Sequence, residues 1–267
     1  MLNLDALKIT DINSKPFNYV VIKDFIKKPF LDKARIDYPE VPGAGSHPPT
    51  DLEIKGGFKE LMNELLGEEF KSVIQDKFEV SLENNPVMYT VRGFCRPKDG
   101  KIHTDSKTKI ITVLLYMNDD NWPSDSGRLR LLNNGTDLED YFDEVEPNGG
   151  TLLVFKRSDN SWHGHHSFDG ARRAIQINWV SDEKVVEREQ GRHGLSSKLK
   201  KFFNKFLVSL AVSKIAICPD SSRTIVFESF ILDANSNPTF LGVILSCLPT
   251  IHKVGCFTLS AAFSPFV

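Results

Sequence analysis

Cysteine is scarce in this chain of 267 residues, which contains four, and no two of them have the C-x-x-C spacing. Cys95 is the only one in the first 200 positions. This usage favours a reducing compartment, so we predict a cytoplasmic protein. The first residues, Met1-Leu2-Asn3-Leu4-Asp5, have neither the basic nor the apolar region of a secretory signal, which agrees with that location.

A strong excess of one charge is also lacking. The formal net charge is −2 and the central region carries no basic stripe, so we do not expect nonspecific binding to nucleic acid. Long apolar runs are interrupted: the uncharged stretch 234–251 contains Asn235, Asn237, Pro238 and Pro249, and we do not predict a membrane span there. The composition, 40% hydrophobic and 25% charged, is ordinary for a soluble protein with one main core.

The residues that indicate chemistry are a histidine–aspartate pair and a distant histidine. In an extended segment, residues i and i+2 project to the same side, so His103 and Asp105 can bind one ion while Thr104 points away. His163 follows 60 positions after His103, enough chain for antiparallel strands to bring it back opposite the pair. Two imidazoles and one carboxylate leave three positions of an octahedral ion open, which suits iron(II) working on O2. His165 remains an alternative to His163 as the third ligand.

Predicted strands surround these residues. Residues 172–180 alternate clearly, and the alternation separates two neighbouring arginines. Arg173 shares its face with Ile175, Ile177 and Trp179, which we take as the inside of a barrel, whereas Arg172 lies on the other face. We therefore predict that Arg173 is a buried cation that binds a dicarboxylate cosubstrate. The other predicted elements are strands at 109–118, 127–132 and 151–155, with turns at 118–121 and 147–150.

A family resemblance rests on four motifs taken together: His103-Thr104-Asp105, the segment 115–118, the segment 149–155, and His163 with Arg173 ten positions later. Over roughly residues 85–182 the chain resembles the iron(II)/2-oxoglutarate-dependent dioxygenases, in particular their prolyl-4-hydroxylase-like branch. The resemblance implies a mostly β fold, a double-stranded β-helix (jelly-roll) core with flanking helices. It also implies iron(II) held by His103, Asp105 and His163, 2-oxoglutarate bound through Arg173, O2 as the oxidant, and ascorbate as the reductant.

Other residues near the metal pair leave alternatives open. Tyrosines on the strand 109–118 bind the cosubstrate carboxylate in the resembling family, but the alternation could direct either Tyr116 or Leu115 inward. Arg92, Arg96 and Lys101 precede the metal pair. We interpret these three as surface residues, with contact to a polar substrate as the alternative.

The resemblance implies a hydroxylase that converts 2-oxoglutarate and O2 to succinate and CO2 while it hydroxylates a substrate. Asp105 favours hydroxylation, because related halogenating enzymes have a small residue at this position. The substrate is not readable: a prolyl or other protein side chain and a small metabolite are both candidates. The alternative function is a noncatalytic, cupin-like metal or sugar-binding module, which needs no buried cation such as Arg173. A zinc hydrolase would need a general base that no motif supplies.

The expected organisation places a strand-and-helix support layer before the jelly roll, in the same domain. Within this layer we predict a strand at 19–22, apolar helical stripes at 58–66 and 70–78, and a loop rich in proline and glycine that covers the site. A basic amphipathic helix at 198–210 allows membrane contact, but we favour packing against the catalytic domain. The boundaries are 1–84 for the support layer, 85–182 for the jelly roll, 183–210 for a charged linker and the amphipathic helix, and 211–267 for an extension of unknown structure.

Overall fold

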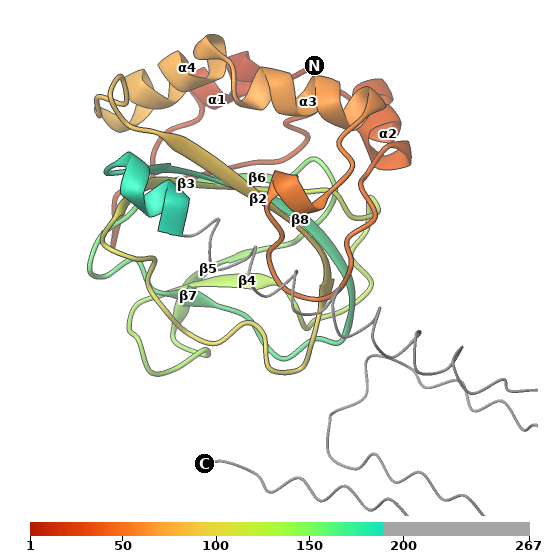
Figure 1. The fold of residues 1–267 in the computed structure, drawn as a ribbon. Helices are drawn as coiled ribbons and strands as arrows, with labels where there is room; N and C mark the ends of the chain where they lie inside the picture. The colour runs from red at the N-terminus through yellow and green to blue at the C-terminus, as the bar shows by residue number, and fades with distance from the viewer. Residues whose placement is uncertain (189–267) are drawn as a thin grey trace, which may run out of the picture. The chain divides into compact units, whose positions relative to one another are not determined.

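The computed structural model describes residues 1–188 (Figure 1). The predicted amphipathic helix and C-terminal extension lie outside the described residues. No helix between residues 1 and 188 combines the length and apolar character needed to span a membrane. In chain order the elements are α1 (Leu4–Ile9), β1 (Tyr19–Ile22), α2 (Lys28–Ile36), the 3-10 helix η1 (Pro49–Asp51), α3 (Gly56–Leu65), α4 (Glu68–Phe78), β2 (Val87–Cys95), β3 (Lys109–Tyr116), β4 (Leu129–Leu132), β5 (Tyr141–Val145), β6 (Leu152–Lys156), β7 (His163–Gly164) and β8 (Gly170–Val180).

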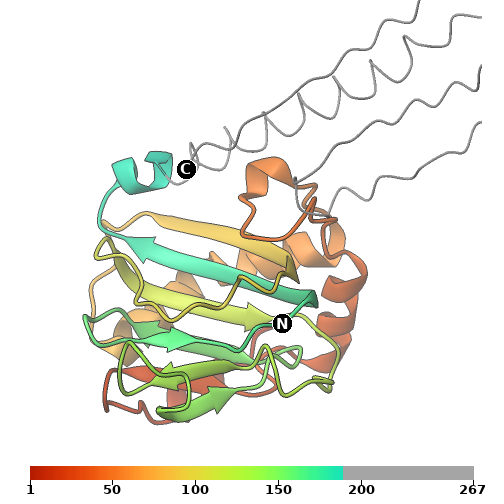
Figure 2. The same cartoon turned by 90° about the horizontal axis from the view of Figure 1, so that it is seen from below.

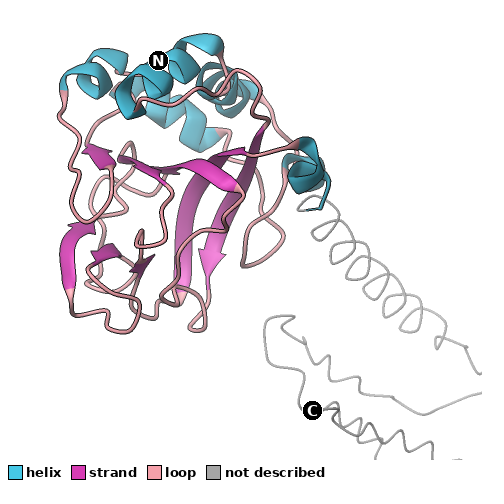
Figure 3. Ribbon diagram, turned by 90° about the vertical axis from the view of Figure 1, so that its left-hand side faces the viewer, coloured by secondary structure: helices cyan, strands magenta, loops and turns pink. Residues whose placement is uncertain are grey.

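The strands form two sheets that face each other, with the helices on the outer face of the larger one (Figures 1 and 3). The larger sheet has the order β1-β6-β3-β8-β2 and the smaller one the order β5-β4-β7. Figure 2, which views the fold from below, shows strands of the larger sheet side by side. All strand pairs in the described part of the chain are antiparallel. The predicted fold, a mostly β jelly roll with flanking helices, is confirmed.

Alternation along the central strands divides the apolar side chains between two cores. In β6, Leu152 and Val154 belong to the core between the larger sheet and the helices, while Leu153 and Phe155 belong to the core between the two sheets. This is the two-residue period of a strand buried on both faces. The inter-sheet core is the smaller of the two, and it leaves room there for polar side chains.

The apolar stripes of α3 and α4 face the larger sheet, as their helical spacing predicts. The ring of Phe70 on α4 packs against Trp179 of β8, with ring centroids 6.3 Å apart. The buried members of the two stripes are Phe58, Leu61, Met62 and Leu65 on α3 and Phe70, Val73, Ile74 and Phe78 on α4.

The predicted position of Arg173 inside the barrel is wrong. Ile175, Ile177 and Trp179, which share its face of β8, pack against the helix layer. Arg173 itself is exposed, and its guanidinium lies 5.4 Å from the centre of the Tyr38 ring. The apolar face of β8 is the face that the helices cover, because the helices supply most of its apolar partners. The more polar face of the strand lies between the sheets.

Candidate active site

The structure brings His103, Asp105 and His163 together at one end of the space between the sheets. His103 and His163 exchange two backbone hydrogen bonds of 3.0 Å, which hold the segment around His103 against β7. One ligand atom from each of the three residues lies within 4.8 Å of the others. Among residues 1–188 this is the one group of histidine, cysteine and acidic side chains with the spacing of a metal site.

The open choice between His163 and His165 is decided by position. The ring of His163 lies beside that of His103, with centroids 4.4 Å apart and the ring planes tilted by 58°. His165 is buried elsewhere, with its Nε2 3.8 Å from the Sγ of Cys95. His163 is therefore the histidine that completes the group.

Both histidines of the group have Nε2 available for a metal ion. The Nδ1 of His103 lies 2.8 Å from the carbonyl oxygen of Lys101, and the Nδ1 of His163 lies 3.0 Å from that of Ser161. A carbonyl can only accept, so each Nδ1 carries the proton and each Nε2 keeps its lone pair for a metal. Burial, together with the charge of His103, lowers the pKa of His163 to about 4. Its imidazole is therefore neutral near pH 7, as a ligand must be.

The carboxylate of Asp105 is fixed from both sides. Lys109 Nζ lies 2.8 Å from its Oδ1, and Thr112 Oγ1 donates to its Oδ2 at 2.5 Å. Asn178 on β8 donates in turn to Thr112 at 2.8 Å. Burial favours the neutral acid, but Lys109 and these hydrogen bonds hold the pKa of Asp105 below its usual range. An ionised, oriented carboxylate beside two imidazoles fits a divalent transition metal.

Replacing Thr112 by valine is expected to weaken iron(II) binding about 10- to 100-fold, because Asp105 loses the hydroxyl that orients it. Anaerobic competition with a chromophoric chelator measures this affinity. Thr90→Val is the matched control, since Thr90 is also buried but does not contact Asp105. Equal losses of iron(II) affinity in the two variants would contradict the positioning role of Thr112.

A buried guanidinium, Arg172, marks a second cluster. Its Nε donates to the carbonyl oxygen of Gly127 at 2.8 Å, and its Nη2 lies 3.4 Å from the hydroxyl of Tyr116. Arg172 is 6% exposed and forms no ion pair with any carboxylate of residues 1–188. A buried charge without a counter-ion is unfavourable, so this arrangement is suited to binding an anion.

Tyr116 is the residue of its pair that points into the site. It lies in the inter-sheet core, whereas Leu115 packs toward the helices. Burial raises the pKa of Tyr116, so its hydroxyl keeps its proton and can donate to a carboxylate.

Three further residues belong to this cluster, and the sequence did not predict that they meet there. Arg92, interpreted from the sequence as a surface residue, is partly buried on β2, and its charge acts on Cys95 and Tyr116. Cys95 and His165 lie beside Arg172, and burial, with that charge, lowers the pKa of His165 to about 4. Polar residues alternating with apolar ones, such as Arg92 after Val91, were the available signal.

Gly100 allows the chain to pass close to His165. Its φ is +87°, and a Cβ at this position would overlap the imidazole of His165. We expect Gly100→Ala to destabilise the fold by about 2 kcal/mol, or roughly 4–8 °C in Tm, through left-handed strain and overlap. Gly45→Ala, with a φ of +104° and open space around it, isolates the strain. If Tm falls equally in both variants, the predicted overlap with His165 is contradicted.

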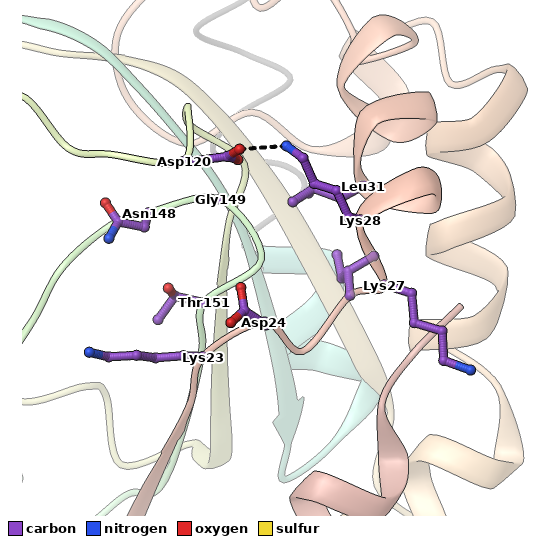
Figure 4. A pocket seen from close by; sticks show the side chains of 10 residues that line it. Lys23, Asp24, Lys27, Lys28, Leu31, Asp120, Asn148, Gly149 and Thr151 are labelled. Carbon is purple, nitrogen blue, oxygen red and sulfur yellow. Dashed lines mark hydrogen bonds and ion pairs between the residues drawn. The ribbon is translucent and has the colours of Figure 1, made fainter.

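A separate pocket of about 420 Å³ lies where α2 begins (Figure 4). Lys23, Lys27, Lys28, Asp120 and Asn148 contribute to its lining, and Lys28 bonds to Asp120 at 2.6 Å. Its lining includes no residue of the metal group or of the arginine cluster. The pocket is therefore distinct from the candidate active site.

Comparison with known proteins agrees with this geometry. Residues 89–181 match the model of the 2OG-Fe(II) oxygenase superfamily, whereas no curated protein matches the sequence. Similar solved structures include the following three. A prolyl-4-hydroxylase from Pseudomonas putida is 16% identical, with 66% of this chain and 90% of that one covered and a TM-score of 0.42. The viral collagen prolyl hydroxylase of Paramecium bursaria Chlorella virus-1, in a 2OG complex, is 13% identical, with 61% and 96% covered and a TM-score of 0.40. HygX from Streptomyces hygroscopicus, with nickel and 2-oxoglutarate bound, is 13% identical, with 62% and 83% covered and a TM-score of 0.42.

The matched region contains both clusters described above. The three residues of the metal group and the buried Arg172 all fall between positions 89 and 181. Residues 89–181, which contain the metal group and Arg172, are therefore the part of this chain that is similar to the 2OG-Fe(II) oxygenase superfamily.

Proposed function

We propose that this protein is a 2-oxoglutarate- and O2-dependent iron(II) hydroxylase whose products are succinate, CO2 and a hydroxylated substrate. His103, Asp105 and His163 hold the iron, which supplies O2 activation when 2-oxoglutarate is also bound. Arg172, in place of the predicted Arg173, binds the distal carboxylate of 2-oxoglutarate together with the hydroxyl of Tyr116.

The observation that carries this proposal is the buried guanidinium of Arg172. It pairs with no carboxylate of residues 1–188, and it lies in the same space between the sheets as the metal group. His163 belongs to the metal group, and His165, two positions later, lies beside Arg172, so this short segment of chain contributes to both clusters. A cupin-like module that only stores a metal has no use for such a cation.

The remaining contacts suit a preorganised site. Phe155 lies against the buried His163, with ring centroids 5.2 Å apart, and helps to fix the position of this imidazole. Thr112 and Asn178 hold Asp105 before any ligand arrives. Ascorbate as reductant and a cytoplasmic location remain part of the proposal, and a prolyl or other protein side chain or a small metabolite remains the substrate.

The test is a single-turnover assay. The protein is loaded anaerobically with iron(II) and 2-oxoglutarate and then exposed to O2, and succinate is measured. We expect succinate from the wild type, even without a primary substrate, and none above background from Asp105→Ala. If the wild type forms no more succinate than the iron-free protein, the hydroxylase proposal is wrong.

A further inference from the structure

Arg92 is a second cation on the site side of the larger sheet. It lies on β2 opposite Ala174 of β8, and its neighbour Val91 packs toward the helices. Because side chains alternate along a strand, Arg92 faces the space between the sheets, as Arg172 does two positions before Ala174. The Nε of Arg92 donates to Ser46 Oγ at 2.8 Å, and this is the only hydrogen bond of the Arg92 side chain within residues 1–188.

No acidic side chain of residues 1–188 forms an ion pair with Arg92. Asp99 is the carboxylate whose charge acts on it, but Asp99 accepts from the backbone N–H of Arg96 at 2.9 Å and pairs with the Arg96 guanidinium at 3.7 Å. Burial lowers the pKa of Arg92, and the like charge of Arg172 adds to this effect. Two neighbouring guanidiniums repel each other when no carboxylate pairs with them. An anionic ligand bound between them would reduce this repulsion.

The cosubstrate alone does not balance the charge of the loaded site. Iron(II), Lys109, Arg172 and Arg92 are positive, and against them stand Asp105 and the two carboxylates of 2-oxoglutarate, which leaves an excess of positive charge. The surrounding segment of the sequence also has an excess of positive charge. Residues 92–109 contain six lysines and arginines and two aspartates, although the whole chain has a net charge of −2.

The position of Arg92 also suits a small ligand. Ser46, which bonds it, belongs to the proline- and glycine-rich segment 39–50, and this segment pairs with the edge of the sheet through two backbone hydrogen bonds between His47 and Val91. Arg92 therefore lies between the sheet and a covering loop, and loops of this kind select substrates.

We propose that the primary substrate is a small molecule bearing a carboxylate or phosphate group, and that Arg92 binds this group. The inference rests on the proposed function, in which Arg172 and Tyr116 already hold the distal carboxylate of 2-oxoglutarate. It makes Arg92 a specificity-determining residue for the same site.

The first experiment measures anion binding directly. The protein is loaded with manganese(II) and saturating 2-oxoglutarate, and the paramagnetic relaxation of two probes, inorganic phosphate and acetate, is followed by NMR. We expect saturable relaxation of at least one probe in the wild type, and the probe that binds more tightly distinguishes phosphate from carboxylate. Arg92→Gln is expected to weaken its binding about 10- to 100-fold. Lys98→Gln, an exposed charge in the same segment, is expected to change it less than about twofold.

The second experiment separates the substrate from the cosubstrate. The affinity for 2-oxoglutarate is titrated anaerobically with iron(II), after circular dichroism has shown that each variant is folded. Arg92→Gln is expected to keep this affinity within about threefold, whereas Arg172→Gln loses it. Similar losses in both variants would assign Arg92 to the cosubstrate and overturn the inference. If the wild type binds 2-oxoglutarate but neither probe, the inference fails and the oxygenase stands, and if it does not bind 2-oxoglutarate, both fail.

Discussion

Arg172→Gln is expected to weaken the binding of 2-oxoglutarate about 100- to 1000-fold, because glutamine keeps most of the volume of the side chain but removes a buried charge that pairs with a carboxylate. The effect is large because Arg172 is 6% exposed, so water screens the interaction little. The affinity is measured by anaerobic titration of the iron(II)-loaded protein, followed by its visible absorption. The same variant is expected to raise the KM for 2-oxoglutarate in the succinate assay.

Arg173→Gln is the matched control for this prediction. The two arginines are adjacent on β8, but Arg173 is exposed and lies over Tyr38 on the other face of the strand. Its loss is expected to change the affinity for 2-oxoglutarate less than about twofold, since exposed charges contribute little. A larger effect of Arg173→Gln than of Arg172→Gln would contradict this assignment. It would show that Arg173 binds 2-oxoglutarate and that the face of β8 carrying Arg173 lines the site.

The second large effect is expected at the histidines. His163→Ala removes one of three metal ligands, and we expect iron(II) affinity to fall by more than about 100-fold. His165→Ala removes an equally buried imidazole that lies outside the metal group, so its iron(II) affinity is expected to stay within about threefold of the wild type. Both affinities are measured by chelator competition on protein whose fold has been checked by circular dichroism. Loss of iron binding in His165→Ala but not in His163→Ala would reverse the assignment.

Much of the metal group was predictable because its signal is local. His103 and Asp105 are two positions apart, and an extended backbone places such residues on one side regardless of the rest of the fold. The strands that return His163 to this pair were also visible as apolar runs between turns, and the structure confirms them with boundaries shifted by a few residues at 109–116, 129–132, 152–156 and 170–180.

The cation could not be assigned because alternation shows which residues share a face and not what that face contacts. The sequence pattern alone predicts that the apolar face of β8 lines the barrel interior. In the structure that face packs against α3 and α4, and the site is lined by the polar face that carries Arg172 and Asn178. A sheet with helices on one side needs its most apolar face there, which leaves polar side chains for the inner site.

The residues of the arginine cluster depend on contacts between distant segments. Arg92 approaches Arg172 only through the register of β2 against β8, and Cys95 meets His165 across 70 positions of sequence. The contact between Arg92 and Ser46 depends on how the segment 39–50 pairs with the sheet edge. The spacing of residues along the chain does not show any of these contacts. The sequence therefore indicates which residue types are present but not that they come together in one cluster.

We propose that His103, Asp105 and His163 hold one iron(II) ion beside a site for 2-oxoglutarate. Anaerobic addition of iron(II) and 2-oxoglutarate tests it most directly, because chelation of the ion by the cosubstrate produces a weak visible charge-transfer band. We predict that the band saturates at one iron per chain in the wild type and is absent from Asp105→Ala. No band in the wild type, or an unchanged band in Asp105→Ala, would contradict the account.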